Sequence, residues 1–210
     1  MNFEANTVYH IYNQGNNRQP VFFTQDNYLF FLRKMRKHLL PYADLLCYCL
    51  MPNHFHWLVY VNSEGADLSK TSQNSGGATS SRTPTPVPGY LPRQNLNHAI
   101  GTLLSSYTRA INIQENRTGS LFRKETKSKN GWIDEFITVD RYRKGSFDFR
   151  AFPDNDYGIQ CFRYILENPV KAGLVNRATD WQYSSAIDFA GLRPGTLCNQ
   201  KLARDLLLLP

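Results

Sequence analysis

The chain has 210 residues, with 24 Lys and Arg against 17 Asp and Glu, which gives a formal net charge of +7. Hydrophobic residues make up 41% and aromatic residues 13% of the sequence, which is enough to bury a core and excludes a wholly disordered protein. There is no run of about 18 apolar residues that could span a membrane, and the first residues do not resemble a signal peptide. We therefore expect a soluble cytoplasmic protein with a polyanionic partner such as nucleic acid.

The cysteines and the composition along the chain predict a simple organisation. The four cysteines form no CxxC pair, and we expect them to be reduced and buried rather than metal-bound. One domain is expected over residues 1–190, followed by a C-terminal extension over residues 191–210. Eighteen of the thirty-three residues at 62–94 are Ser, Thr, Gly or Pro, which predicts a flexible insertion within this domain.

The N-terminal third predicts a strand, a helix and two further strands. Residues 7–13 are rich in β-branched and aromatic types and end in turn residues, which favours a strand. Asp26 is the expected N-cap of a helix over residues 28–40, where apolar residues recur at helical spacing at Leu29, Leu32, Met35 and Leu39. Residues 43–51 and 55–61 are apolar and predict an antiparallel pair in the middle of a sheet.

Basic residues are concentrated in two places. Arg33, Lys34, Arg36 and Lys37 form the outer face of the first predicted helix, where both a solvated face and contact with nucleic acid remain open. A second helix is predicted from Asn95 to about Asn116. Six further cations follow between residues 105 and 129, where two glutamates leave a local charge of +4: Arg109, Arg117, Arg123, Lys124, Lys127 and Lys129. Both groups are candidates for contacts with a nucleic-acid backbone.

The last part of the chain predicts one more helix. Residues 130–155 are expected to contain strand and loop segments. A helix over residues 157–167 should end at Asn168, because Pro169 disfavours the helical conformation in the residue before it. One further turn should then end at Gly173 in the left-handed conformation.

Two histidines and a tyrosine could form a catalytic site. His54 and His56 lie two residues apart in a predicted strand, so their imidazoles point to the same face and could bind a metal ion together, although a pair of ordinary histidines remains open. Tyr164 and Asn168 are neighbours at i, i+4 on one helix face and could supply a nucleophile and a third ligand. Core packing for Tyr164 and a capping role for Asn168 remain open as well. The sequence contains no HExxH, P-loop or GxGxxG pattern, so zinc-protease and nucleotide-hydrolase chemistry lacks its usual motifs.

Four blocks of sequence resemble the single-tyrosine HUH transposase family, and most closely its REP-associated tyrosine transposase branch. In chain order they are residues 10–15 (HIYNQG), 51–59 (MPNHFHWLV), 117–123 (RTGSLFR) and 164–175 (YILENPVKAGLV), the last followed by 181–185 (WQYSS). Residues 62–94, and the stretch between Phe122 and Tyr157, depart from the family pattern, so DNA contacts there cannot be transferred.

The resemblance implies a bacterial enzyme that cuts and rejoins single-stranded DNA beside hairpin repeats through a 5′-phosphotyrosine intermediate. It implies an α+β, ferredoxin-like fold, in which a central antiparallel sheet carries the His-x-His motif and the catalytic tyrosine lies on a C-terminal helix. By position, His54, His56 and Asn168 match the metal site and Tyr164 matches the nucleophile. Imidazoles alone suit Zn²⁺, but an amide oxygen, phosphate and water favour Mg²⁺ or Mn²⁺.

Two other functions compete with this expectation. A DNA-binding or regulatory protein could keep the fold and recognise hairpin repeats without cutting them. A metal hydrolase that acts on small phosphates would not need Tyr164. The expected enzyme would act as a monomer or homodimer near the nucleoid, and the sequence does not name the DNA that it recognises.

Overall fold

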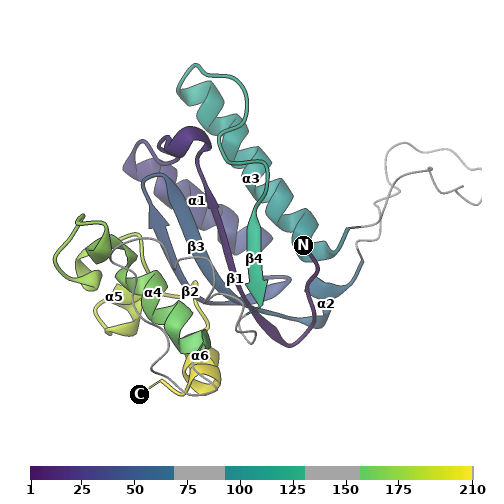
Figure 1. Ribbon diagram of the computed structural model, residues 1–210, viewed down its shortest axis with the longest axis vertical. Helices are drawn as coiled ribbons and strands as arrows, with labels where there is room; N and C mark the ends of the chain where they lie inside the picture. The colour runs from purple at the N-terminus through teal and green to yellow at the C-terminus, as the bar shows by residue number, and fades with distance from the viewer. Residues whose placement is uncertain (69–92, 131–156, 210) are drawn as a thin grey trace, which may run out of the picture.

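The computed structural model describes residues 1–68, 93–130 and 157–209, and its centre is a four-stranded antiparallel sheet (Figure 1). The strands are β1 (Thr7–Gln14), β2 (Ala43–Met51), β3 (His54–Val61) and β4 (Lys127–Asn130). Their order in the sheet is β2-β3-β1-β4, and every neighbouring pair is antiparallel. With helices between β1 and β2 and between β3 and β4, this is the βαββαβ arrangement of a ferredoxin-like fold, so the predicted fold class is confirmed.

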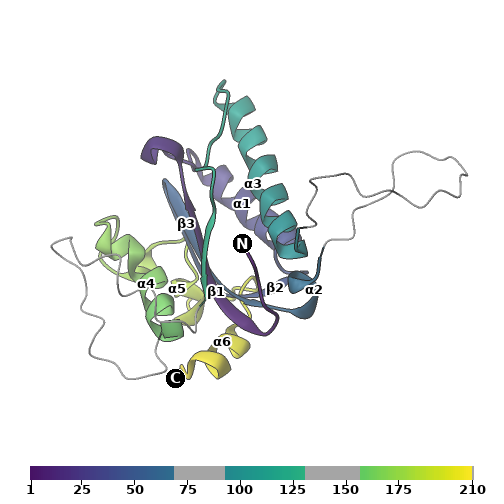
Figure 2. The same cartoon turned by 45° about the vertical axis from the view of Figure 1, so that its right-hand side comes forward.

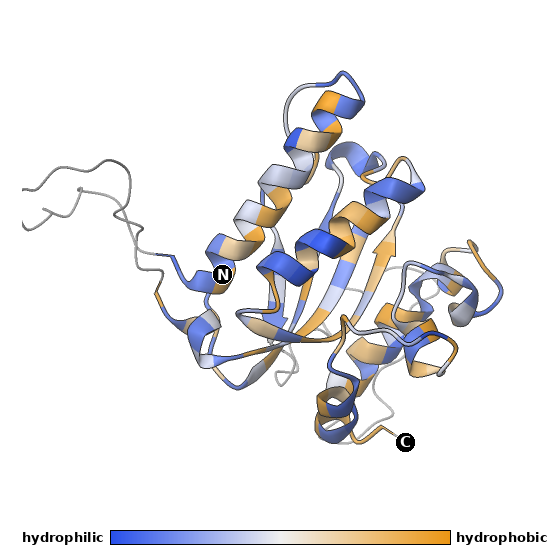
Figure 3. Ribbon diagram, turned by 180° about the vertical axis from the view of Figure 1, so that it is seen from behind, coloured by the Kyte–Doolittle hydropathy of each residue, from blue (hydrophilic) through white to orange (hydrophobic). Residues whose placement is uncertain are grey.

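Helices cover both faces of the sheet. Helices α1 (Gln25–His38) and α3 (Asn95–Gln114) lie on one face, and α4 (Tyr157–Lys171) and α6 (Gln200–Leu207) lie on the other (Figure 2). Because strand side chains alternate between faces, Phe55 and Trp57 of β3 join the core under α1 and α3, whereas the histidines of β3 point towards α4. Figure 3 shows α1 and α3 from behind, where hydrophilic and hydrophobic residues alternate along both helices.

The short elements close the ends and edges of this core. They are a 3₁₀ turn at Asn16–Arg18, α2 (Ser63–Ala66), a 3₁₀ turn at Ala178–Asp180 and α5 (Ala186–Phe189). The segment around Trp181 covers the outer edge of β2, where the indole N–H donates to the carbonyl of Leu50 at 2.9 Å and the N–H of Leu50 donates to the carbonyl of Tyr183. The exposed edge of a strand is thereby protected against pairing with another chain.

Helix α1 begins at Gln25 with Thr24 as its N-cap, so the predicted N-cap Asp26 is wrong. The Asn27 side chain accepts hydrogen bonds from the backbone N–H groups of Phe23 and Thr24, which fixes the earlier start. The buried stripe of this helix is centred on Phe31 and Met35. Leu29 was expected in it but is 40% exposed, because the helix is rotated towards the aromatic core.

Parts of the predicted insertion are packed. Asn62 caps α2 by accepting a hydrogen bond from the backbone of Gly65, and Gly65 is buried where its backbone closely approaches the carbonyl of Tyr42. At the other end, Gln94 hydrogen-bonds the backbones of Phe3 and Ala66. Residues 62–68 and 93–94 are therefore ordered parts of the fold at the two ends of the predicted insertion. The rest of the insertion, and nearly all of residues 130–155, lie outside the described residues.

Helix α4 continues through Pro169 to Lys171, which corrects the predicted end at Asn168. Asn168 and Pro169 are both buried, and the backbone bond from Ala172 to Asn168 continues the helical pattern past the proline. Tertiary packing therefore outweighs the local steric preference. Gly173 follows with a φ of 70°, so the predicted left-handed glycine is confirmed.

The C-terminal residues are part of the core rather than a separate extension. Ala203 and Leu207 of α6 are buried against β2 and α4, and the N–H of Asn199 donates to the carbonyl of Leu45. All four cysteines are buried and unpaired with one another, as expected. Among the described residues, no helix has the length and apolarity needed to cross a membrane.

Candidate active site

Two histidines of β3 lie together on the sheet face that α4 covers. The ring centroids of His54 and His56 are 5.1 Å apart, with the planes nearly perpendicular. His54 Nδ1 lies 2.6 Å from the side-chain oxygen of Asn53. Because an amide oxygen only accepts hydrogen bonds, Nδ1 of His54 is the donor, and its Nε2 carries a lone pair. His54 is therefore held in the tautomer that can bind a metal ion through Nε2.

Burial keeps both imidazoles neutral. Desolvation lowers the pKa of His54, while the hydrogen bond with Asn168 partly opposes that change. Desolvation lowers the pKa of His56 well below its ordinary value, with smaller contributions from His10 and His54. Neutral imidazoles are the form that coordinates metals, so the two rings are ready to act as ligands near neutral pH.

Helix α4 places Tyr164 and Asn168 over these rings. The ring of Tyr164 is half-buried, and its centroid lies 5.5 Å from that of His56 in an edge-on arrangement. Asn168 follows one turn later and is buried, and its side chain raises the pKa of the neighbouring His54. The structure thus brings together all four residues that the sequence singled out for chemistry, from β3 and from the far end of the chain.

The side chains present could bind a divalent cation whose remaining coordination positions are filled by the substrate and water. The described residues contain no group of three or more His, Cys, Asp or Glu side chains that could hold a metal ion. The chain itself offers two imidazoles and the amide of Asn168, which leaves positions for phosphate oxygens and water. The buried Nδ2 of Asn168 has no hydrogen-bond partner among the residues that the structure describes, and a phosphate oxygen would supply one.

A small cavity of about 230 Å³ opens at this cluster. Its polar lining contains three charged residues, namely Arg123, Glu125 and Lys127, beside both histidines and Tyr164. Lys171 of α4 has its Nζ 5.3 Å from the centre of the Tyr164 ring and forms an ion pair with Glu167 at 3.4 Å. The excess of positive charge around the cavity favours an anionic substrate.

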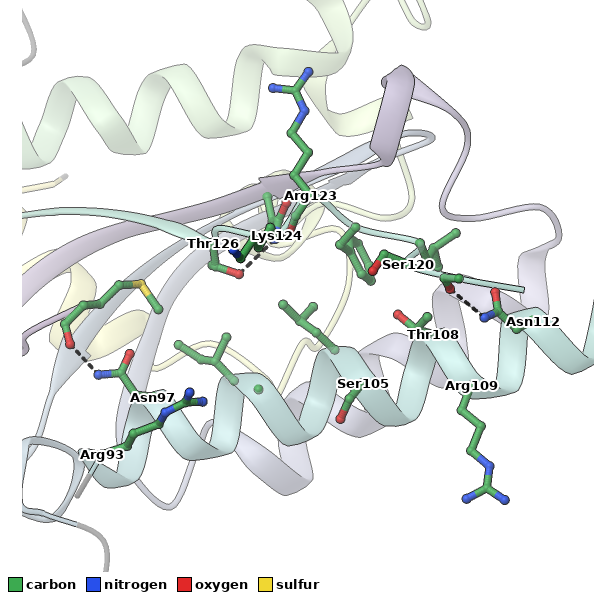
Figure 4. A pocket seen from close by; sticks show the side chains of 18 of the residues that line it. Arg93, Asn97, Ser105, Thr108, Arg109, Asn112, Ser120, Arg123, Lys124 and Thr126 are labelled. Carbon is green, nitrogen blue, oxygen red and sulfur yellow. Dashed lines mark hydrogen bonds between the residues drawn. The ribbon is translucent and has the colours of Figure 1, made fainter. Parts of the chain in front are cut away.

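A larger groove of about 1540 Å³ lies between α3 and residues 117–126 (Figure 4). Among the described residues that line this groove there is no His54, His56 or Tyr164, so the groove is not the candidate catalytic site, although it is larger than the cavity. Its lining includes five cations and no carboxylate: Arg93, Arg109, Arg117, Arg123 and Lys124. Arg109 and Arg123 extend in opposite directions from its two walls. Asn13 and Arg123 line both hollows, so the groove and the small cavity adjoin at these two residues.

The predicted cations are therefore not gathered at one place. Lys127 and Lys129 of β4 pair with Tyr12 and His10, so they lie on the side of the cavity. Arg109, Arg117 and Lys124 line the groove beside α3. Arg33, Lys34, Arg36 and Lys37 lie on α1, which together with α3 packs on the face of the sheet opposite to the histidine pair. Two of these α1 cations have partners within the chain, since Lys34 donates to Ser106 and Arg36 donates to Thr196. The α1 cations are thus not brought to the candidate site.

Two residues that the sequence does not mark for chemistry, His10 and Tyr12, lie next to the histidine pair. Both lie on β1 and share the face of His56, where Tyr12 pairs with His56 across the strands. The rings of Tyr12 and His56 stack with their centroids 5.6 Å apart. His10 is 1% exposed, and its Nε2 lies 2.9 Å from Nδ1 of His56. Alternation along the strand could have placed both residues on one face, but only the strand register shows that they meet His56.

No protein-family model and no curated protein sequence matches the chain. Among solved structures, the chain resembles a REP-associated tyrosine transposase bound to a REP hairpin, with a TM-score of 0.53 and 15% sequence identity. The match covers 95% of this chain and 92% of the other. At this identity the likeness shows the fold alone, so the chain shares the α+β fold of that transposase.

Proposed function

We propose that the protein is a metal-dependent endonuclease and strand transferase that acts on single-stranded DNA through a covalent 5′-phosphotyrosine intermediate. The observation that carries this proposal is the convergence of His54, His56 and Tyr164 on one small cavity with a cationic surround, with Asn168 beside His54. The shared fold with a tyrosine transposase supports the same conclusion.

In the proposed reaction, the phenolic oxygen of Tyr164 attacks the phosphorus of a backbone phosphate. The bond between phosphorus and the 3′ oxygen breaks, the phenolic proton is lost to water, and the departing 3′ oxygen takes up a proton. The 5′ phosphate is left on Tyr164. A 3′-hydroxyl can later attack this phosphotyrosine and restore the phosphodiester, so rejoining needs no nucleotide cofactor.

A divalent cation, Mg²⁺ or Mn²⁺, would be held by His54, His56 and Asn168, and when bound it neutralises charge on the scissile phosphate and makes the phosphorus more electrophilic. Other residues of the chain bind the DNA and hold the tyrosine in place. The side chain of Arg123 can bind the phosphate backbone at the mouth of the cavity, and the tyrosine is fixed on a helix packed into the core.

The groove is the proposed path of the DNA. A lining with five cations and no carboxylate suits a phosphate backbone, and its amide and hydroxyl groups can add hydrogen bonds. The DNA would pass Asn13 and Arg123 to reach the cavity. We propose DNA hairpins of palindromic repeats and their flanking single strands as partners, and a monomer or homodimer located in the cytoplasm with the nucleoid.

Two tyrosines line the small cavity, and the geometry favours Tyr164 as the nucleophile. Tyr12 stacks its ring face on His56, with 30° between the planes, so the two rings cover each other. Tyr164 instead approaches His56 edge-on, at 86°, from the helix that also carries Asn168. Burial strongly raises the pKa of a third tyrosine, Tyr157, with Cys161 adding to the effect, and this disfavours the phenolate that attack requires.

The test is cleavage of an end-labelled hairpin with a single-stranded flank in Mn²⁺, using Tyr164→Phe and the matched control Tyr12→Phe. We expect Tyr164→Phe to abolish cleavage and to leave hairpin binding nearly unchanged, whereas Tyr12→Phe keeps cleavage. Binding without metal-dependent cleavage by the unaltered protein would instead identify a DNA-binding protein that does not cut.

A further inference from the structure

His10 lies next to His56, on the neighbouring strand β1. In the register of β1 and β3, His10 pairs with Leu58, so it is the diagonal neighbour of His56 on the same face. His10 Nε2 and His56 Nδ1 are 2.9 Å apart, and the two rings stack with their centroids 5.1 Å apart. His10 is 1% and His56 6% exposed, so water does not compete for this hydrogen bond.

Only two arrangements of protons satisfy this contact. Both rings are buried away from water, where a charged imidazolium is costly, so both are neutral and each carries one N–H. In one arrangement His10 donates from Nε2, and His56 must then carry its own proton on Nε2. In the other, His56 donates from Nδ1 to His10, and the Nε2 of His56 keeps its lone pair. Only the second leaves His56 able to bind a metal ion.

The other ring nitrogen of His10 faces helix α4. His10 Nδ1 lies 4.0 Å from the sulfur of Cys161. Burial raises the pKa of this thiol to about 11, so it stays protonated, and its sulfur can accept a weak hydrogen bond. In the metal-competent arrangement, His10 holds its proton on Nδ1 and directs it at this sulfur. Cys161 lies one turn before Tyr164, so the same contact joins β1 to the helix that carries the proposed nucleophile.

We propose that His10 is a positioning residue that accepts the Nδ1 proton of His56 and thereby keeps the Nε2 of His56 free to bind the metal ion. This inference rests on the proposed metal site. His54 is held in the same way, because its Nδ1 donates to the side-chain oxygen of Asn53 and its Nε2 keeps its lone pair. Partners of this kind orient metal-binding histidines in many proteins, and their loss lowers metal affinity about 10–100-fold. Here the partner is a second imidazole.

The first test uses the native protein without metal. A long-range ¹H–¹⁵N correlation spectrum of the histidine rings distinguishes the two neutral tautomers. We expect both His10 and His56 to carry the proton on Nδ1. Protons on Nε2 of both rings would overturn the proposal, and this measurement depends on no variant.

The second test compares Mn²⁺ affinity of the full chain in His10→Phe, which removes the acceptor, and His10→Gln, which keeps one. We expect about 10–100-fold weaker binding for His10→Phe and near-native binding for His10→Gln, with circular dichroism to check that both are folded. Native Mn²⁺ affinity in a folded His10→Phe would refute the role of His10. Failure of the unaltered protein to bind Mn²⁺ would refute the metal site itself, and with it the proposed function.

Discussion

Acidification from pH 7 to pH 5 should destabilise the protein through its buried histidines. Desolvation lowers the pKa of His10 to about 3, and it lowers the pKa of His56 well below its ordinary value. An unfolded histidine has a pKa near 6.5. Between pH 6.5 and the folded-state pKa, the unfolded chain binds more protons than the folded protein, so the free energy of unfolding falls as the pH falls.

The size of the effect follows from these values. A histidine that stays neutral in the folded state, and titrates near 6.5 in the unfolded state, loses about 2 kcal/mol of stability between pH 7 and pH 5. His10 and His56 together should therefore cost about 4 kcal/mol over this interval, which is a large share of the stability of a typical domain.

Urea unfolding followed by circular dichroism at the two pH values measures this loss. The matched variant His10→Gln removes one of the two titrating groups, so its loss between pH 7 and pH 5 should be smaller by about 2 kcal/mol. Contributions from the other titrating groups cancel in the comparison. An equal loss in the variant and the unaltered protein would show that His10 is not held neutral by burial, and the reasoning would fail.

Two further predictions concern the core and the groove. Leu207→Ala should reduce the free energy of unfolding by about 2–5 kcal/mol, because Leu207 is 2% exposed and packs against the sheet. The neighbouring Leu208→Ala, at an 84% exposed position, should change the free energy of unfolding little. Similar effects of the two variants in urea unfolding would contradict the packing of α6. Arg109→Ala should lower the slope of log affinity against log salt by about 0.7–0.9 for a hairpin with a single-stranded flank, whereas Arg33→Ala on α1, outside the groove, should not. The reverse result would place the DNA on α1.

The sequence alone could predict much of the sheet and the faces of its strands. Alternation along residues 54–57 separates the two histidines from Phe55 and Trp57, and helical spacing places Tyr164 and Asn168 on one face. The resemblance to a transposase family added the ferredoxin-like fold, which fits the order of the elements predicted from the residues. These features depend on the spacing of side chains along one strand or one helix, which can be read from a single sequence.

The rest depends on contacts between distant segments. The meeting of His10 with His56 follows from the register of β1 and β3, which no local pattern specifies. Strand β4 has the sequence Lys-Ser-Lys-Asn and no apolar side chain to mark it, because it is an edge strand paired only with β1. Pro169 suggested a helix end, but burial of Asn168 and Pro169 outweighs the local preference.

The central claim is that Tyr164 becomes covalently joined to DNA. The most direct measurement incubates the protein with a hairpin oligonucleotide that carries a single-stranded flank, in Mn²⁺ and in chelator, followed by digestion and mass spectrometry of the nucleotide-linked peptide. Twelve tyrosines compete for the assignment. The account predicts a metal-dependent 5′ phosphate link on Tyr164 alone, which is lost in Tyr164→Phe and kept in Tyr12→Phe. A link on Tyr12, or cleavage with no covalent protein adduct, would contradict it.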